Sequence, residues 1–259
     1  MTNSSAIHVA EYRYRNMWKW KRAIIVYGLG NPILYLASIG LGVGSLVDAK
    51  GGGIDGVGYL TFLAPALLAS ASIQGGMDEV TMPVLAGFIW NKLFFAMNST
   101  SLTAVQIANG VLMASATRVT FTAVTYWAVL LAFGTVPISS ALTLIPSAIF
   151  AGVAFACVMM WLAATVKNDD GFFALIGRFV VTPMFLFSGT FYPLNSLPMT
   201  VQWIGWVSPL WHATEIGRAL SYGAGTTASL FWVHVAFLAC IAFVGLRLAH
   251  RQFDRRLSA

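Results

Sequence analysis

A long stretch without charge constrains this chain most: no Asp, Glu, Lys or Arg occurs from Val119 to Val166. A bilayer core takes about 20 mostly apolar residues per helix, so the stretch is long enough for two spans. Gly134-Thr135-Val136-Pro137 is a turn signal that predicts spans over 119–133 and 141–166. Overall, 58% of residues are hydrophobic and 9% are charged, whereas soluble domains carry about 25% charged residues. The sequence therefore predicts an integral membrane protein and excludes a soluble globule or a disordered chain.

Four further apolar segments are long enough, or nearly so, to cross a bilayer. They predict spans over 23–46, 59–77, 172–188 and 230–248. The expected fold class is therefore all-α: one polytopic transmembrane domain, residues 1–259, with six transmembrane helices. The first segment is too apolar over too great a length for a cleaved signal peptide, so we expect an uncleaved helix.

Basic residues gather at the two ends of the chain. They are Arg13, Arg15, Lys19, Lys21 and Arg22 near the start, and Arg247, Arg251, Arg255 and Arg256 near the end. Lys and Arg are enriched in cytoplasmic segments of membrane proteins. We therefore expect both termini in the cytoplasm, as an even number of spans requires, and a location in the cytoplasmic (inner) membrane. A membrane-surface role explains the net charge of +6 more simply than nucleic-acid binding does.

Three segments do not fit simple spans. Residues 1–22 interleave basic and aromatic side chains, which is typical of an interfacial helix, although a flank that only sets topology has similar composition. Residues 78–118 form a cytoplasmic connection too long for a passive turn; their aromatic run over 88–97 predicts a short helix that lies on the bilayer or docks into a partner protein. Residues 189–229 are broken by Pro193, Pro198 and Pro209, which predicts two short re-entrant helices on the extracellular side, or an outer loop lying flat on the membrane.

His212, Glu215 and Arg218 are the one tight group of ionisable residues, at three-residue spacing on one probable helix face. Without a nucleophile or a metal-ligand set, we interpret them as ion pairs and hydrogen bonds that close an outer gate, not as a catalytic site. His234 and His250 stand apart from this group and suggest no special role. No metal site is expected, because the two cysteines lack CxxC spacing and no Cys/His cluster occurs.

Several motifs resemble the permease subunits of ABC-2 type exporters, in particular the branch of nodulation-factor (lipo-oligosaccharide) and daunorubicin exporters. They are Ser188-Gly189-Thr190-Phe191-Tyr192-Pro193-Leu194, Ser208-Pro209-Leu210-Trp211-His212 and Pro83-Val84-Leu85-Ala86-Gly87-Phe88. The resemblance implies that residues 89–98 form a coupling helix that docks on an ATPase subunit, and that residues 201–212 belong to the extracellular hairpin. The implied ATPase contacts are Trp90, Asn91, Lys92, Phe94, Phe95 and Met97. Thr100-Ser101 departs from the Thr-Pro that is usual after this helix.

The resemblance implies an ATP-driven exporter built from two permease and two ATPase subunits, with the second permease either identical or a paralogue. This chain has no Gly-x-x-x-x-Gly-Lys-Ser/Thr run, so we expect no cofactor on it and ATP-Mg on the partner ATPase. Two other functions remain open. An ion-coupled secondary transporter is disfavoured because the central parts of the six predicted spans hold no Asp or Glu. The hypothesis of a membrane enzyme that modifies lipids is supported only by the group of ionisable residues around Glu215, which is weak evidence for a catalytic site.

The cargo expected from the sequence is amphiphilic, because the lack of buried charge disfavours a small ionic substrate. A lipid-linked saccharide, a lipid and a hydrophobic drug all fit this description. Core or lipid-facing packing is the safer assignment for most aromatic side chains of the predicted spans. Four of them are candidates for the substrate path: Trp127, Phe155, Phe185 and Phe187.

Overall fold

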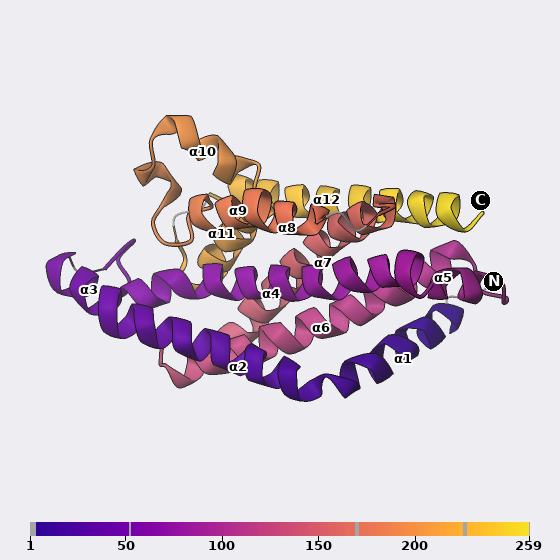
Figure 1. Cartoon of the computed structure of the whole chain (residues 1–259). Coiled ribbons are helices and arrows are strands. Elements are labelled where there is room, and N and C mark those ends of the chain that lie inside the picture. Colours follow the sequence, from indigo (N-terminus) through magenta and orange to yellow (C-terminus); the bar gives the residue numbers. More distant parts are fainter. Residues whose placement is uncertain (1–3, 52, 169–170, 225–226, 259) are drawn as a thin grey trace.

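The computed structural model describes residues 4–51, 53–168, 171–224 and 227–258, and it confirms an all-α membrane protein (Figure 1). No strand element occurs within these ranges. The helices are α1 (Ser4–Lys19), α2 (Lys21–Ser38), α3 (Ser45–Gly51), α4 (Tyr59–Leu85), α5 (Leu93–Asn98), α6 (Ala104–Ala132), α7 (Ala141–Thr165), α8 (Phe172–Ile176), α9 (Thr182–Phe187), α10 (Met199–Trp206), α11 (Pro209–Tyr222) and α12 (Ala228–Leu257).

Four helical segments of the described chain are long and apolar enough to cross a membrane: Lys21–Ala49, Tyr59–Trp90, Ile138–Thr165 and Ala228–Leu257. The helical segment Phe172–Phe187 is apolar but shorter. Helix α6 has 29 residues and carries Gln106, Asn109 and Arg118, and it is not among these four. The six-span topology therefore stays a prediction that assigns spans to α6 and to Phe172–Phe187 as well.

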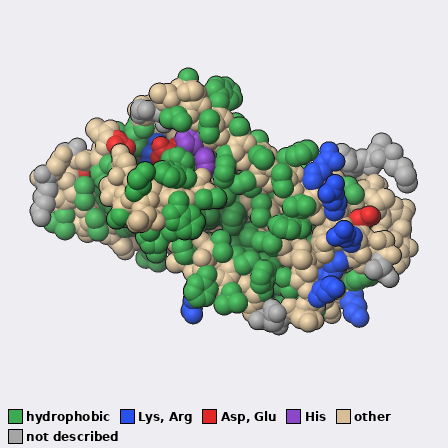
Figure 2. Space-filling view, turned by 90° about the horizontal axis from the view of Figure 1, so that it is seen from above, with side chains coloured by type: hydrophobic (Ala, Val, Ile, Leu, Met, Phe, Trp, Pro, Cys, Tyr) green, Lys and Arg blue, Asp and Glu red, His purple; other side chains and the backbone are tan. Residues whose placement is uncertain are grey.

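Both chain termini lie at the same end of the molecule, together with α5 (Figure 1). Helix α3 lies toward the opposite end (Figure 1). Lys and Arg side chains form a band near the end with the termini, whereas hydrophobic side chains cover much of the surface between the ends (Figure 2). We call the end with α5 and the last turns of α12 the basic end. Charge and apolar surface are thus separated along the helices, as a bilayer requires.

Two helices of the structure extend beyond the segments predicted from the sequence. Helix α4 continues beyond the predicted span 59–77, past Asp78 and Glu79 to Leu85, and on this added stretch Glu79 pairs with Arg13 of α1. The end of the predicted segment 78–118 and the predicted span 119–133 form one continuous helix, α6. It begins at a capping box in which Thr103 and Gln106 satisfy each other's backbone N–H groups at 3.3 and 2.9 Å. No Gly or Pro separates the two predicted segments at residues 116–119, so nothing there breaks the helix.

Helices α4 and α7 approach closely where glycines face each other. A Cβ on Gly152 would lie 2.6 Å from the carbonyl oxygen of Ser72, and one on Gly76 would lie 2.6 Å from the carbonyl oxygen of Gly152. Small residues at such crossings let helix backbones pack against each other without a hydrophobic driving force. This contact forms the centre of the bundle, around which α6, α11 and α12 pack.

The segment after α9 forms two short helices, α10 and α11, as the proline pattern predicts. Pro209 occupies the first turn of α11, and the hydroxyl of Ser208 caps this helix by accepting hydrogen bonds from the backbone N–H groups of Leu210 and Trp211. Gly223, with φ of 70°, ends α11 in the left-handed conformation that favours glycine. Helix α11 packs against α4, α7 and α12, so its polar residues point into a helical environment.

Candidate functional site

A cavity of about 330 Å³ opens between α2, α4 and the segment that leads into α9. Six lining residues carry uncharged hydrogen-bonding groups: Asn31, Tyr35, Ser70, Gln74, Tyr126 and Thr182. The other lining residues are apolar: Leu67, Ala71, Ile73, Val181, Met184, Phe185 and Leu210. No charged side chain lines it. Such a lining can bury an apolar chain and hydrogen-bond neutral polar groups beside it.

The polar groups of this cavity are held in place by their own helices. Ser70 donates to the carbonyl of Ala66 at 2.8 Å, and Thr182 donates to that of Gly177 at 2.9 Å. The Gln74 amide donates to Asp78 at 2.7 Å, which leaves its oxygen as a free acceptor. Hydrogen-bonding groups that are held in place and can still bond to a further partner are typical of a preformed binding site.

Of the four aromatic residues predicted for a substrate path, only Phe185 lines this cavity. Its ring packs against Tyr35 and Phe191 at 6.3 and 5.2 Å between centroids. The indole of Trp127 donates to Ser140 at 3.1 Å. Phe155 is buried in the main core, and Phe187 is half-buried at the end of α9. The structure therefore does not bring the four residues together.

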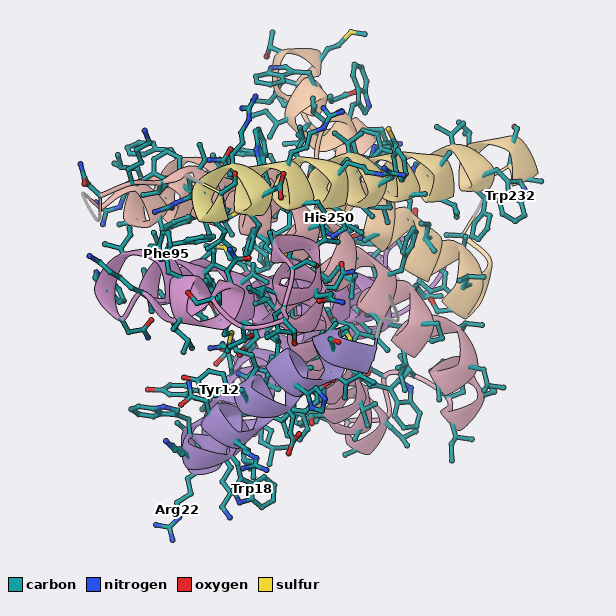
Figure 3. The ribbon with its side chains drawn as sticks, turned by 90° about the vertical axis from the view of Figure 1, so that its right-hand side faces the viewer. Tyr12, Trp18, Arg22, Phe95, Trp232 and His250 are labelled. Atoms are coloured by element: carbon teal, nitrogen blue, oxygen red, sulfur yellow. The ribbon has the colours of Figure 1, made fainter. Side chains whose placement is uncertain are left out.

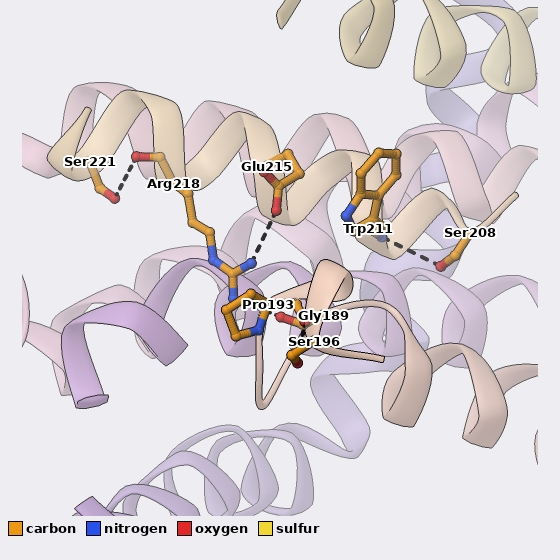
Figure 4. A network of polar contacts seen from close by, with 8 residues as sticks. All are labelled: Gly189, Pro193, Ser196, Ser208, Trp211, Glu215, Arg218 and Ser221. Atoms are coloured by element: carbon orange, nitrogen blue, oxygen red, sulfur yellow. Dashed lines mark hydrogen bonds and ion pairs between the residues drawn. The ribbon is translucent and has the colours of Figure 1, made fainter. Parts of the chain in front are cut away.

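Arg218 and Glu215 form the ion pair expected from the sequence, at 3.0 Å (Figure 4). Arg218 is 2% exposed; it also donates to the carbonyl of Gly189 at 2.7 Å and stacks over the ring of Phe62 at 3.8 Å. Burial raises the pKa of Glu215 above its ordinary value of 4.5, although the Arg218 charge opposes this shift. Arg218 thus fastens α11 to α4 and to the loop after α9.

His212 does not join the Glu215–Arg218 pair but contacts α12. Its Nδ1 lies 2.8 Å from Nδ1 of His234, and its Nε2 lies 3.0 Å from the carbonyl oxygen of Trp206. The interpretation of His234 as an isolated residue was therefore wrong: 22 positions separate it from His212 in sequence, and the packing of α11 against α12 brings them together. Burial lowers the pKa of His212 below 6.5, against the opposing effect of the Trp206 hydrogen bond.

The predicted coupling helix over 89–98 is shorter in the structure. Ile89 and Trp90 continue the helical segment that follows α4, and Lys92 breaks it with a φ of 50°. The side-chain oxygen of Asn91 then accepts a hydrogen bond from the backbone N–H of Leu93 at 3.1 Å and starts α5. Helix α5 is therefore Leu93–Asn98, at the basic end (Figure 3).

The six predicted ATPase contacts divide by exposure. Trp90, Asn91, Lys92 and Phe95 are exposed, and Met97 is half-buried. Phe94 is 3% exposed and packs between Phe88 and Phe253, with ring centroids 4.9 and 5.5 Å away. Phe94 therefore anchors α5 to α12 rather than facing outward. A groove of about 450 Å³ separates α5 and the end of α4 from α1, and four of the six line it: Trp90, Asn91, Phe94 and Met97.

A buried charge cluster beneath α1 was missed by the sequence analysis. Nη2 of Arg13 on α1 donates to Oε1 of Glu79 on α4, and both residues are buried. Asp78 and Arg118 lie beside this pair around a cavity of about 250 Å³. The signal available in the sequence was a carboxylate pair at 78–79 inside an otherwise apolar segment, but nothing in it identified Arg13 as the partner. The pair ties α1 to the helix that leads to α5.

No group of three or more His, Cys, Asp or Glu side chains that could hold a metal ion occurs in the described part of the chain. Cys157 and Cys240 are free thiols on different helices, α7 and α12.

Comparisons with known proteins agree with the fold and the motifs. The family described as ABC-2 type transporter matches residues 7–222. Nodulation protein J of Rhizobium meliloti (strain 1021) is 28% identical over 246 residues, which cover 94% of this chain and 91% of the relative. Nodulation protein J of Rhizobium leguminosarum bv. viciae is 29% identical over 212 residues, or 81% of this chain and 80% of the relative. The chain is therefore a multi-pass membrane transport subunit, and it belongs to the ABC-2 type transporter family.

Proposed function

We propose that this chain is the permease subunit of an ATP-driven exporter that moves an amphiphilic molecule out across the cytoplasmic membrane. The observation that carries the proposal is the uncharged cavity between α2, α4 and α9, in a chain of this transporter family. Its hydrogen-bonding groups favour a lipid-linked saccharide over a purely hydrophobic drug, because a drug would leave these polar groups unpaired. The absence of charge from its lining disfavours an ionic cargo.

Energy for transport comes from a separate ATPase, of which two copies bind two permease subunits with ATP-Mg on the ATPase. The exposed residues Trp90, Lys92 and Phe95 fit an ATPase surface, and the groove between α1 and α5 fits an inserted segment of it. In this proposal both termini and the basic end lie in the cytoplasm. Membrane lipids surround the remaining surface.

Helix α4 links the two sites mechanically. The helical segment Ala86–Trp90 continues α4 to the break before α5, and residues 67–74 of α4 line the cavity. When the ATPase pair closes, it would push on α5. Because the ring of Phe94 anchors α5 to the bundle, this push would move α4 as a rigid body. Movement of α4 changes the cavity, and a cargo that binds the two arrangements differently is carried between them.

Transport in proteoliposomes that contain the permease and its ATPase tests this function. We expect ATP-dependent movement of a fluorescent lipid-linked saccharide, and at least a tenfold loss of rate in Asn31→Leu or Tyr35→Phe with assembly unchanged. Asn195→Leu, an exposed position outside the cavity, serves as the control. Transport by the permease without any ATPase, or unchanged rates in both cavity variants, would contradict the proposal.

The coupling surface has its own test in co-purification with the ATPase. Lys92→Glu and Phe95→Asp should abolish co-purification while the permease still inserts, because both change exposed side chains. Arg255→Glu reverses an exposed charge of α12 at the same end and should keep the complex intact. Normal co-purification of Lys92→Glu and Phe95→Asp would refute docking at α5.

A further inference from the structure

A second feature of the basic end is a cavity of about 650 Å³ on the outer face of α12 beside α6. It is lined by Val105, Phe243, Val244, Arg247, Leu248, His250 and Arg251. Its apolar part lies toward the middle of α12, and its basic part lies toward the C-terminal end. The cavity therefore spans the level at which α12 passes from apolar to basic sequence.

Helix geometry aligns the two parts. Phe243, Arg247 and Arg251 follow one another at four-residue spacing, which places them on one face of α12. The guanidinium of Arg247 lies 5.0 Å from the ring centroid of Phe243. His250 is labelled in Figure 3. Its Nε2 hydrogen-bonds to Oδ1 of Asn109 on α6 at 2.7 Å, and this bond holds α12 and α6 together at the bottom of the cavity.

The positive charge of this cavity is not neutralised by the protein. Neither Arg247 nor Arg251 forms an ion pair with another described residue, and no carboxylate lines the cavity. Asp254 lies one turn further along α12, outside the lining. The cavity beneath α1 differs in this respect, since its two arginines face the carboxylates of Asp78 and Glu79. An anionic ligand is therefore favoured at α12 and not beneath α1.

We propose that this cavity binds the headgroup of an anionic phospholipid from the leaflet at the basic end. Arg247 and Arg251 would bind the phosphate, and the acyl chains would lie along Phe243 and Val244, which are 60% and 46% exposed. The basic part of the cavity thus lies where the phosphate of a phospholipid would lie, and the apolar part lies where its acyl chains would lie. This inference depends on the membrane placement of α12 and not on the transported cargo.

Lipid binding to the purified full-length permease tests the site. Phosphatidylglycerol should bind more tightly than phosphatidylcholine by native mass spectrometry. The double variant R247Q/R251Q should weaken phosphatidylglycerol binding about 30-fold, the effect expected for two basic residues near an anionic surface. The double variant R15Q/R255Q removes the same charge at exposed positions outside the cavity and should bind like the wild type. Equal weakening in both double variants, or no preference between the lipids, would overturn the proposal.

A second measurement needs no variant. Photo-crosslinking with a diazirine-labelled phosphatidylglycerol should label residues 243–251 of the wild-type protein, and labelled phosphatidylcholine should not. Inorganic phosphate at equal concentration should not reduce this labelling. Equal labelling by the two lipids, or complete competition by inorganic phosphate, would reject a phospholipid site.

Discussion

Nδ1 of His212 lies 2.8 Å from Nδ1 of His234, and this contact joins α11 to α12. The geometry assigns the protons of the pair. The carbonyl of Trp206 can only accept, so Nε2 of His212 carries a proton and donates to it. The Nδ1 atom of neutral His212 is then an acceptor, and Nδ1 of His234 donates to it. Protonation of His212 would turn its Nδ1 into a donor, and the contact would then require His234 to move its own proton to Nε2 and accept at Nδ1.

The first prediction concerns the loss of this contact. His234→Ala should lower the free energy of unfolding in detergent by about 1–3 kcal/mol, because His212 Nδ1 is left buried without a donor. His8 is exposed on α1, so His8→Ala should change the value by less than about 0.5 kcal/mol. Similar values for the two variants, measured by chemical denaturation, would contradict the assigned pairing.

The same pair predicts a pH dependence. Burial lowers the pKa of His212 below 6.5, so the unfolded state binds a proton that the folded state does not. The contribution of His212 to stability is complete above pH 6.5 and decreases as the pH falls through the pKa of the folded state. Glu215, whose pKa is raised, acts in the opposite direction. The slope should therefore be compared between wild type and His212→Gln over pH 7.5 to about 5.5, and it should be smaller in the variant.

The ion pair between Arg13 and Glu79 predicts that the removal of one of its two charges strongly lowers the free energy of unfolding. Both side chains are about nine-tenths buried, with 10% and 11% exposed. Glu79→Gln should lower the free energy of unfolding by about 3–5 kcal/mol, since it leaves the Arg13 charge buried and unpaired. The double change Arg13→Met and Glu79→Leu should cost less than Glu79→Gln alone, because it removes both charges together.

A matched control for this pair exists on the same helix. Glu11 pairs with Arg15 at 2.7 Å, but these side chains are 50% and 78% exposed. Glu11→Gln should therefore change stability by less than about 1 kcal/mol. If thermal unfolding shows equal effects for Glu11→Gln and Glu79→Gln, burial does not control the strength of these pairs.

Features that depend on local composition were predictable from the sequence. Apolar length predicted the membrane class, and the three prolines at 193, 198 and 209 predicted that the segment after α9 breaks into short helices. The Glu215–Arg218 pair was predictable because three-residue spacing on a helix already places the two side chains together.

Features that depend on distant contacts were not predictable in this way. The partners of His212 and Glu79 are 22 and 66 positions away, and no periodicity identifies them. Arg13 lies on α1 and Glu79 on α4, so their pairing depends on how the two helices pack and not on the sequence around either residue. Phe94 was expected to be an outward contact, but hydrophobic character alone does not tell whether an aromatic ring meets a partner or its own chain.

The crossing of α4 and α7 predicts opposite effects for two glycine substitutions. A Cβ at Gly152 would lie 2.6 Å from both the Ser72 carbonyl oxygen and Cγ1 of Val119, so Gly152→Ala should destabilise by about 1–3 kcal/mol. Nothing lies within 4 Å of a Cβ at Gly30 on α2, so Gly30→Ala should stabilise the helix by up to about 1 kcal/mol. Thermal unfolding that shifts in the same direction for both variants would contradict the close crossing.

Arg218 and Glu215 should differ in importance although they form one pair. Arg218 holds three groups at once: Glu215, the carbonyl of Gly189 and the ring of Phe62. Arg218→Gln leaves a carboxylate and a buried carbonyl without a donor and should destabilise by about 3–5 kcal/mol.

Glu215→Gln should cost less than Glu79→Gln, about 1–3 kcal/mol, because Arg218 keeps its hydrogen bond to the carbonyl of Gly189 and its contact with the ring of Phe62. It removes the negative charge, however, so a gate closed by this pair should open more readily and show an altered transport rate while assembly with the ATPase stays normal. Transport assays on Glu215→Gln separate the two roles, because unchanged transport together with unchanged assembly would leave the pair a purely structural link between α11, α4 and the loop at Gly189.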